Sequence, residues 1–178
     1  MPMGSGVRVL VTGGTFDKVY HPMLEQLIFE ETHVPEILKL GRNRANVVIE
    51  QLMLKDSLYM TDEDRQLILR KCQSCLEDRL LVTHGTGTMV ETAAVLGKNL
   101  KRKTAVLTGA MVPFSIKNSD AMFNFAFGYC AALTLPVGIY IAMNGRIFHW
   151  NNVQKNTEGG YFETSEFNHS MNGGGCLP

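Results

Sequence analysis

Two short motifs in this chain place a threonine hydroxyl beside glycines. Thr15 follows a glycine pair in TGGTFDKVY, and Thr86 stands between two glycines in HGTGT. A threonine hydroxyl becomes a useful nucleophile only when a neighbouring base takes its proton. Glycine in a turn lets the backbone approach a ligand closely. The backbone N–H groups of such a turn can then bind a carboxylate or an oxyanion. The two motifs therefore indicate hydroxyl chemistry, anion binding, or both.

Four other side chains belong to polar segments that could complete such a site. Asp56 and Ser57 follow an apolar run, and they offer a carboxylate for an ammonium group and a hydroxyl for a carboxylate. Lys155, in NVQKNT, could act as a base, because burial makes a lysine lose its proton more easily. Tyr20 lies a few residues beyond Thr15, in a segment that could fold over the site. Each of these residues could also be an ordinary loop residue in contact with water.

The elements that would position these residues alternate between strands and helices. A helical pattern covers residues 61–78, 89–100 and 119–133, and a short helix begins near Pro35. This order predicts an open parallel sheet with helices on both faces. Ligands bind such sheets at the carboxyl ends of the strands, so TGGTFD, KDS and HGTGT, which each follow a strand, are expected on one rim. Apolar runs predict these strands at residues 7–12, 47–54, 79–83, 104–107, 137–143 and 146–150.

The charge balance gives no sign of a nucleic-acid or anionic-membrane partner, because Lys+Arg and Asp+Glu both number 17. No segment has the apolar length of a membrane span and the first residues lack a signal-peptide pattern, so we expect a cytoplasmic protein. Cys72 and Cys75 form a C-x-x-C inside a predicted helix, which favours structural thiols over a metal site. Residues 1–165 are expected to form one domain, and residues 166–178 a mobile tail.

Five ordered blocks together resemble the bacterial-type L-asparaginase family. They are TGGTFDK, LKDSLYMTDEDR, THGTGTMVETAAVL, VLTGAMVPFSIKNSDAMFNFAFG and GIYIAMNGRIFHWNNVQKN, and the resemblance covers roughly residues 9–162. The resemblance implies a flavodoxin-like α/β domain that hydrolyses L-asparagine, and to some extent glutamine, to the acid and ammonia. It implies no metal or cofactor, and a homo-oligomer, either a dimer or a tetramer. Most members carry a second, smaller C-terminal domain, so the chain is similar to the short single-domain members.

The resemblance also assigns roles to the residues singled out above. Thr15 matches the threonine usually assigned as the nucleophile, and Tyr20 matches the mobile-loop tyrosine that assists it. Thr86 and Lys155 match the second threonine and its partner lysine, and Ser57 matches the serine that holds the substrate carboxylate. Substrate binding is further expected at Gly14, Asp56, Gly85 and Gly87.

The blocks depart from the family pattern at two positions. Gly87 stands where the family motif His-Gly-Thr-Asp-Thr has the aspartate that binds the substrate ammonium group and partners the lysine. Tyr59 stands where the family usually has an acidic residue. A lost charge-assisted contact is worth about 1.5–3 kcal/mol. We therefore expect either a substrate without a free ammonium group or weakened activity, unless Asp56 compensates.

Two other functions are compatible with the same residues. A catalytically inactive amino-acid-binding module would keep the fold and the pocket without turnover. A nucleotide-phosphate binder would use HGTGT as a phosphate cradle after a strand, although the chain has neither G-x-x-x-x-G-K-[ST] nor G-x-G-x-x-G. These readings differ in the ligand that should stabilise the protein: an amino acid or a nucleotide.

Overall fold

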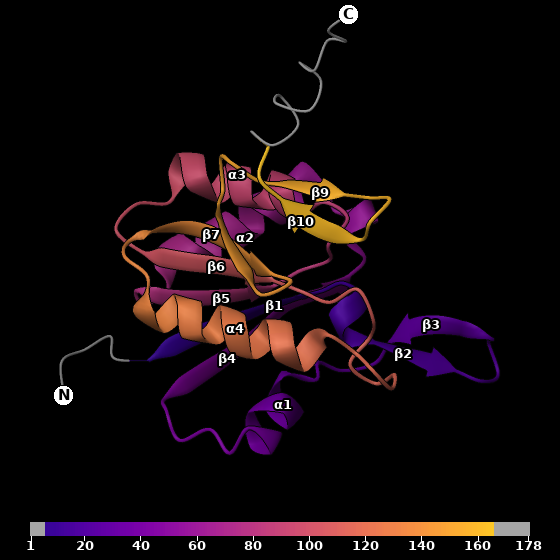
Figure 1. Ribbon diagram of the computed structural model, residues 1–178. Coiled ribbons are helices and arrows are strands. Elements are labelled where there is room, and N and C mark those ends of the chain that lie inside the picture. The colour runs from indigo at the N-terminus through magenta and orange to yellow at the C-terminus, as the bar shows by residue number, and fades with distance from the viewer. Residues whose placement is uncertain (1–5, 166–178) are drawn as a thin grey trace, which may run out of the picture.

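The computed structural model describes residues 6–165, which are built around a central six-stranded sheet (Figure 1). The strands lie in the order β4-β1-β5-β6-β7-β8, with the first five parallel and β8 antiparallel to β7. Without the edge strand β8, this is the 2-1-3-4-5 order of flavodoxin-like folds, so the expected fold class is confirmed. The strands are β1 (Val7–Gly13), β4 (Val47–Lys55), β5 (Arg79–Thr83), β6 (Thr104–Thr108), β7 (Gly138–Met143) and β8 (Arg146–His149).

Helices cover both faces of the sheet, with α2 and α3 on one face and α1 and α4 on the other (Figure 1). Successive side chains of a strand point to opposite faces, and each face of this sheet carries its own apolar cluster. In β5, Leu80 and Val82 pack in the cluster of α2 and α3, whereas Leu81 packs in the cluster of α1 and α4. The helices are α1 (Val34–Leu40), α2 (Asp62–Ser74), α3 (Met89–Asn99) and α4 (Ala121–Thr134).

Local sequence signals account for several of these boundaries. Thr61 begins α2 with a capping box, because its hydroxyl accepts the Asp64 N–H and the Asp64 carboxylate accepts the Thr61 N–H. Pro35 lies in the first turn of α1, as expected. Asn144 and Gly145 both have positive φ, at 55° and 71°, and form the predicted turn between β7 and β8. The helix α2 ends at Ser74, four residues before the predicted end at residue 78.

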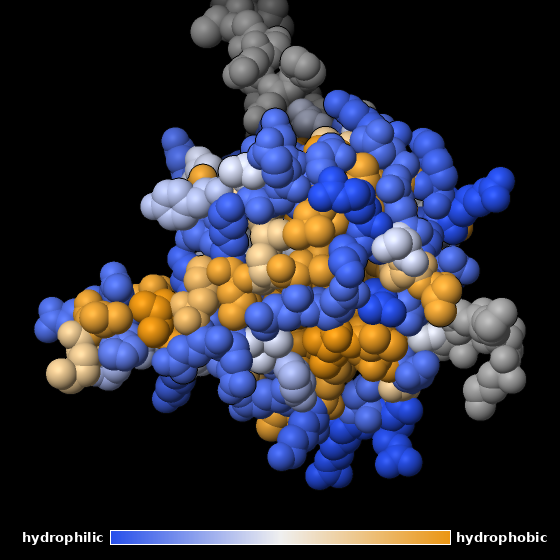
Figure 2. Space-filling view, turned by 180° about the vertical axis from the view of Figure 1, so that it is seen from behind, coloured by the Kyte–Doolittle hydropathy of each residue, from blue (hydrophilic) through white to orange (hydrophobic). Residues whose placement is uncertain are grey.

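Two short hairpins were not predicted from the sequence. The antiparallel pair β2 (Lys18–His21) and β3 (Gln26–Phe29) projects from the body of the molecule, and β9 (Gln154–Asn156) pairs with β10 (Tyr161–Glu163) (Figure 1). Hydrophobic residues are exposed along the projecting hairpin (Figure 2), among them Met23 at 87%. Strands of three or four residues are too short to show a clear alternation of apolar and polar residues.

Two sequence predictions concern the C-terminal residues and membrane-spanning segments. The tail expected at residues 166–178 lies outside the described residues. Within residues 6–165, no helix is long and apolar enough to cross a membrane.

Candidate active site

The expected rim lies at the reversal of strand order, between β1 and β5. The turn after β1 and the turn after β5 touch each other there through glycines. A Cβ on Gly14 would lie 2.8 Å from the carbonyl carbon of His84, and closer still to the backbone of Gly85. Gly14 also has φ 79° and ψ −176°, a conformation that is essentially restricted to glycine. Glycine at this position therefore lets the two motif loops lie in direct backbone contact.

A cavity of about 240 Å³ opens beside this contact. Seven of its lining residues were expected at the site from the sequence, and Leu58 and Met111 complete the wall. Two of the expected site residues, Gly14 and Tyr20, are not among the lining residues. The seven expected residues are Thr15, Asp56, Ser57, Gly85, Thr86, Gly87 and Lys155.

Thr86 and Lys155 form a direct pair in this cavity. Lys155 extends from β9, and its Nζ donates to Thr86 Oγ1 at 2.8 Å. Burial lowers the pKa of Lys155 below its ordinary value. None of the ion pairs found among residues 6–165 involves Lys155. A hydroxyl beside an amine that loses its proton more readily has the geometry of a nucleophile with its base.

Thr15 contributes a second hydroxyl from a short 3₁₀ turn, Thr15–Asp17. Its hydroxyl makes no hydrogen bond to another described residue, so it can bond to a ligand. The N–H of Gly14 donates to the Lys55 carbonyl at 2.9 Å, which corrects the expectation that this N–H stabilises an oxyanion. The N–H groups of Thr86 and Gly87 make no hydrogen bond within the described part of the chain, and they are the better placed donors.

Ser57 and Asp56 line the cavity where β4 passes into the 3₁₀ turn Ser57–Tyr59. Ser57 is buried, and Thr88 holds it by two hydrogen bonds, from its N–H to Ser57 Oγ at 3.3 Å and from its hydroxyl to the Ser57 carbonyl at 2.8 Å. Asp56 is already paired, because its Oδ2 accepts from Lys18 Nζ at 2.5 Å. The carboxylate expected to receive a substrate ammonium group thus holds a lysine of the protein.

His84 fixes the turn that carries Thr86. It is completely buried, with Nδ1 at 2.8 Å from the Gly85 carbonyl and Nε2 at 2.8 Å from Thr92 Oγ1. Since the carbonyl only accepts, the proton lies on Nδ1 and the Thr92 hydroxyl donates to Nε2. Burial lowers the pKa of His84 to about 4, so the ring is neutral at neutral pH. Sequence analysis missed this role, because nothing in HGTGT shows that the histidine points inward.

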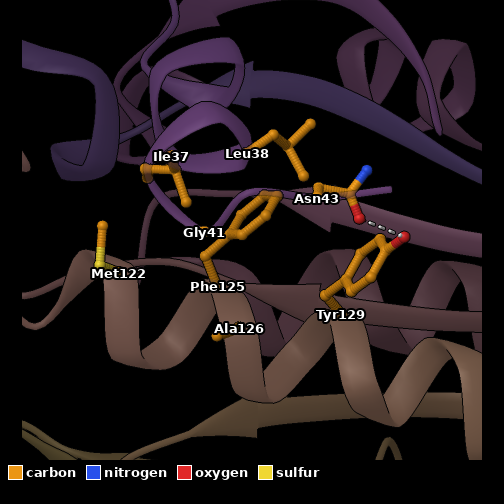
Figure 3. A pocket seen from close by; sticks show the side chains of 8 residues that line it. All are labelled: Ile37, Leu38, Gly41, Asn43, Met122, Phe125, Ala126 and Tyr129. Carbon is orange, nitrogen blue, oxygen red and sulfur yellow. Dashed lines mark hydrogen bonds between the residues drawn. The ribbon is translucent and has the colours of Figure 1, made fainter. Parts of the chain in front are cut away.

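A second cavity, of about 290 Å³, lies between α1 and α4 (Figure 3). Its walls are mostly apolar, and they include Phe125 and Ile37. Its polar edge is a 3.4 Å hydrogen bond from the Tyr129 hydroxyl to Asn43 Oδ1 (Figure 3). This cavity is lined by no lysine, histidine or carboxylate and by no serine or threonine, so the cavity of Thr86 is the candidate active site. Within residues 6–165, no group of three or more His, Cys, Asp or Glu residues could hold a metal ion.

The sequence blocks and this geometry agree with comparisons to known proteins. The Asparaginase, N-terminal family model matches residues 6–170. The chain belongs to the asparaginase family. It is 27% identical over 164 residues to L-asparaginase 1 of Escherichia coli (strain K12), and this match covers 84% of the chain and 47% of that protein.

Solved asparaginases share the fold. The thermostable L-asparaginase from Thermococcus kodakarensis superimposes with a TM-score of 0.78 at 28% identity, over 89% of this chain and 51% of that one. A probable cytoplasmic L-asparaginase from Campylobacter jejuni gives 0.80 at 26% identity, over 92% and 54%. The chain therefore spans about half the length of the asparaginases that it matches.

Gly87 and Tyr59, the two departures from the asparaginase pattern, lie at different positions relative to the cavity. Gly87 lines the cavity with an ordinary backbone conformation, and a Cβ there would lie 2.8 Å from Leu58 Cδ2. Tyr59 is 75% exposed and is not among the lining residues. Tyr20, which is not one of these departures, also lies away from the cavity wall and is 56% exposed on β2 of the projecting hairpin. Of the two departures, Gly87 is the one that changes the cavity wall.

Proposed function

We propose that this chain is an amidohydrolase of the asparaginase type, which hydrolyses L-asparagine, and L-glutamine as a second substrate. The observation that carries the proposal is the 2.8 Å contact between Lys155 Nζ and Thr86 Oγ1, in a cavity that also holds Thr15. Family membership supports an amidohydrolase-type enzyme. The curated and solved relatives described above are L-asparaginases by name.

In the proposed reaction, a threonine hydroxyl or an activated water attacks the carbon of the substrate carboxamide. Lys155 in its neutral form takes the proton of Thr86, and the N–H groups of Thr86 and Gly87 stabilise the developing oxyanion. The C–N bond then breaks and the ammonia leaves with the proton. If threonine is the nucleophile, its oxygen forms an ester with the substrate carbon, and water then hydrolyses this ester and restores the hydroxyl; if water attacks directly, its oxygen replaces the nitrogen in one sequence. One water is consumed, and the products are a carboxylate and ammonium. Ser57 holds the α-carboxylate of the substrate, and Thr15 is the second candidate nucleophile.

Tyr20 enters the proposal through the hairpin that carries it. Lys18 and Tyr20 are two residues apart on β2, so they share one face of the hairpin. Lys18 reaches Asp56 at the cavity wall, and Tyr20 lies further out on the same face. A hairpin that bends over the cavity would bring the Tyr20 hydroxyl to Thr15, where it could assist proton transfer. Loss of this hydroxyl in Tyr20→Phe should then lower kcat without lowering stability.

Gly87 is expected to weaken turnover of L-asparagine. An acid at this position would meet the substrate ammonium group, and its absence removes a contact worth about 1.5–3 kcal/mol. The same absence favours the second candidate, an inactive amino-acid-binding module, which would bind L-aspartate without releasing ammonia. Asp56 does not compensate directly, since Lys18 occupies it.

The proposal is tested by ammonia release from L-asparagine and L-glutamine. We expect slow release by the unaltered chain, release at least roughly tenfold faster in Gly87→Asp, and loss of release in Thr86→Val. The matched control is Thr134→Val, which removes an exposed hydroxyl bonded only to its own helix at Cys130. Silence from both the unaltered chain and Gly87→Asp would overturn the proposed activity in favour of the binding module. Thermal stabilisation by nucleotides and none by aspartate would favour phosphate binding instead.

A cytoplasmic location and a homo-oligomeric assembly, either a dimer or a tetramer, also belong to the proposal. The first is supported by the similarity to the probable cytoplasmic L-asparaginase from Campylobacter jejuni, and the second by the family resemblance. Light scattering during size-exclusion chromatography measures the assembly, and a mass of one chain would refute this part.

A further inference from the structure

The charged groups of the cavity do not provide a place for a substrate ammonium group. Of the described residues that line it, only Asp56 and Lys155 have acidic or basic side chains. Asp56 Oδ2 accepts from Lys18 at 2.5 Å, and its Oδ1 accepts the Leu58 N–H at 3.0 Å. Burial alone would raise the pKa of Asp56, but Lys18 and the Leu58 N–H outweigh it and keep the pKa below its ordinary value. The carboxylate is therefore ionised and already neutralised.

The wall at Gly87 carries no charged side chain where a second carboxylate could have stood. A Cβ built on Gly87 would lie 2.8 Å from Leu58 Cδ2 and 3.2 Å from Ser57 Oγ. A side chain at this position would therefore occupy the space into which Leu58 now extends. The protein presents a Leu58 methyl group and the Ser57 hydroxyl there instead of an anion, so an ammonium group beside them gains no charged partner.

Counting the charges gives the cavity a positive sign. Lys18 and Asp56 cancel. In its protonated form, in which Nζ donates to Thr86 Oγ1 at 2.8 Å, Lys155 adds one positive charge that no ion pair among residues 6–165 offsets. A carboxylate is attracted to this environment, whereas an ammonium group is repelled by Lys155 and finds Asp56 occupied. An ammonium group would thus weaken binding of an otherwise suitable amide.

We infer that the cavity selects monoamides of dicarboxylic acids that lack a free α-ammonium group, in preference to L-asparagine. This inference rests on the proposed amide hydrolysis and names its substrate class. Leu58 and the Lys18–Asp56 pair determine this specificity, because they occupy the two places where an ammonium group could have been held. The reaction is the same hydrolysis, with water consumed and ammonium released.

The test compares succinamic acid, which is L-asparagine without its amino group, with L-asparagine itself. We expect kcat/KM for ammonia release to favour succinamic acid by roughly tenfold or more. Gly87→Asp should reverse this preference, whereas Gly87→Asn, which has nearly the same size and no charge, should not. Leu58 is 70% exposed, so its side chain can rotate away from either substituent. Equal use of the two amides, or preference for L-asparagine, would overturn the inference and leave the proposed function intact.

Product binding separates the inference from the proposed function. Calorimetric titration with succinate and with L-aspartate needs no turnover, and succinate should bind at least roughly tenfold more tightly. If no variant releases ammonia from any amide, the proposed hydrolysis fails, and tighter binding of succinate still supports the selectivity. Tighter binding of L-aspartate, or binding of neither acid, would then overturn the inference as well.

Discussion

Gly14→Ala tests whether the two motif loops lie in direct contact, on which the whole site depends. The methyl group would lie 2.8 Å from the His84 carbonyl carbon and closer to Gly85, so backbone would have to move. Overpacking of this kind costs about 1–3 kcal/mol, and forcing an alanine into φ 79° and ψ −176° costs about 1–3 kcal/mol more. The free energy of unfolding should therefore fall by about 2–6 kcal/mol.

Urea unfolding followed by circular dichroism measures this loss, and Gly145→Ala is its control. Gly145 also has positive φ, at 71°, but a Cβ there would lie 3.5 Å from the ring of Phe123, which is an ordinary contact. The control should lose only about 1–2 kcal/mol from its backbone conformation. Equal losses in the two variants would refute the close approach of the loops at Gly14.

Three further predictions concern stability and reactivity. The unfolding free energy should fall by about 3 kcal/mol between pH 6.5 and pH 4, because unfolded His84 takes up a proton in this range and the native ring, with its pKa of about 4, does not. His84→Asn should flatten this part of the pH titration, and an unchanged slope would contradict it. Thr61→Ala should cost about 1 kcal/mol in urea unfolding by removing the capping box of α2, and an unchanged midpoint would mean that the cap is dispensable. A thiol reagent should label exposed Cys130 quickly and Cys72 slowly, because Cys72 is buried and burial raises the pKa of its thiol to about 12. Equal labelling rates would be inconsistent with this burial.

The main elements of the fold could be predicted because their sequence signals are long and consistent. Leu80 to Val82 is apolar on both faces of β5, as a strand covered by helices on both sides requires. Thr61 and Asp64 are the two residues of a capping box, so the residue at which α2 begins could be predicted from the sequence. The hairpin of β2 and β3 was not predictable, because Met23 and its apolar neighbours are exposed and follow no core pattern.

The gathering of the site residues followed from topology, whereas their pairing did not. Thr15, Ser57 and Thr86 each follow a strand of one parallel sheet, so they were expected on one rim. Lys18 could not be assigned to Asp56 from the sequence, because the contact joins residues 38 positions apart. The pair is the reason why we expect that Asp56, although it lines the cavity, does not replace the family aspartate.

The most direct test of the account is a double-mutant cycle on Thr86 and Lys155, measured as kcat/KM for ammonia release from the amide that the chain uses best. If the 2.8 Å pair acts as one nucleophile–base unit, Thr86→Val and Lys155→Met should each lose roughly 10²–10⁴-fold. The double variant should then lose no more than the worse single variant, because residues that act as a unit are strongly non-additive. Losses that multiply, or a Lys155→Met variant that keeps its turnover, would contradict the central role of this pair.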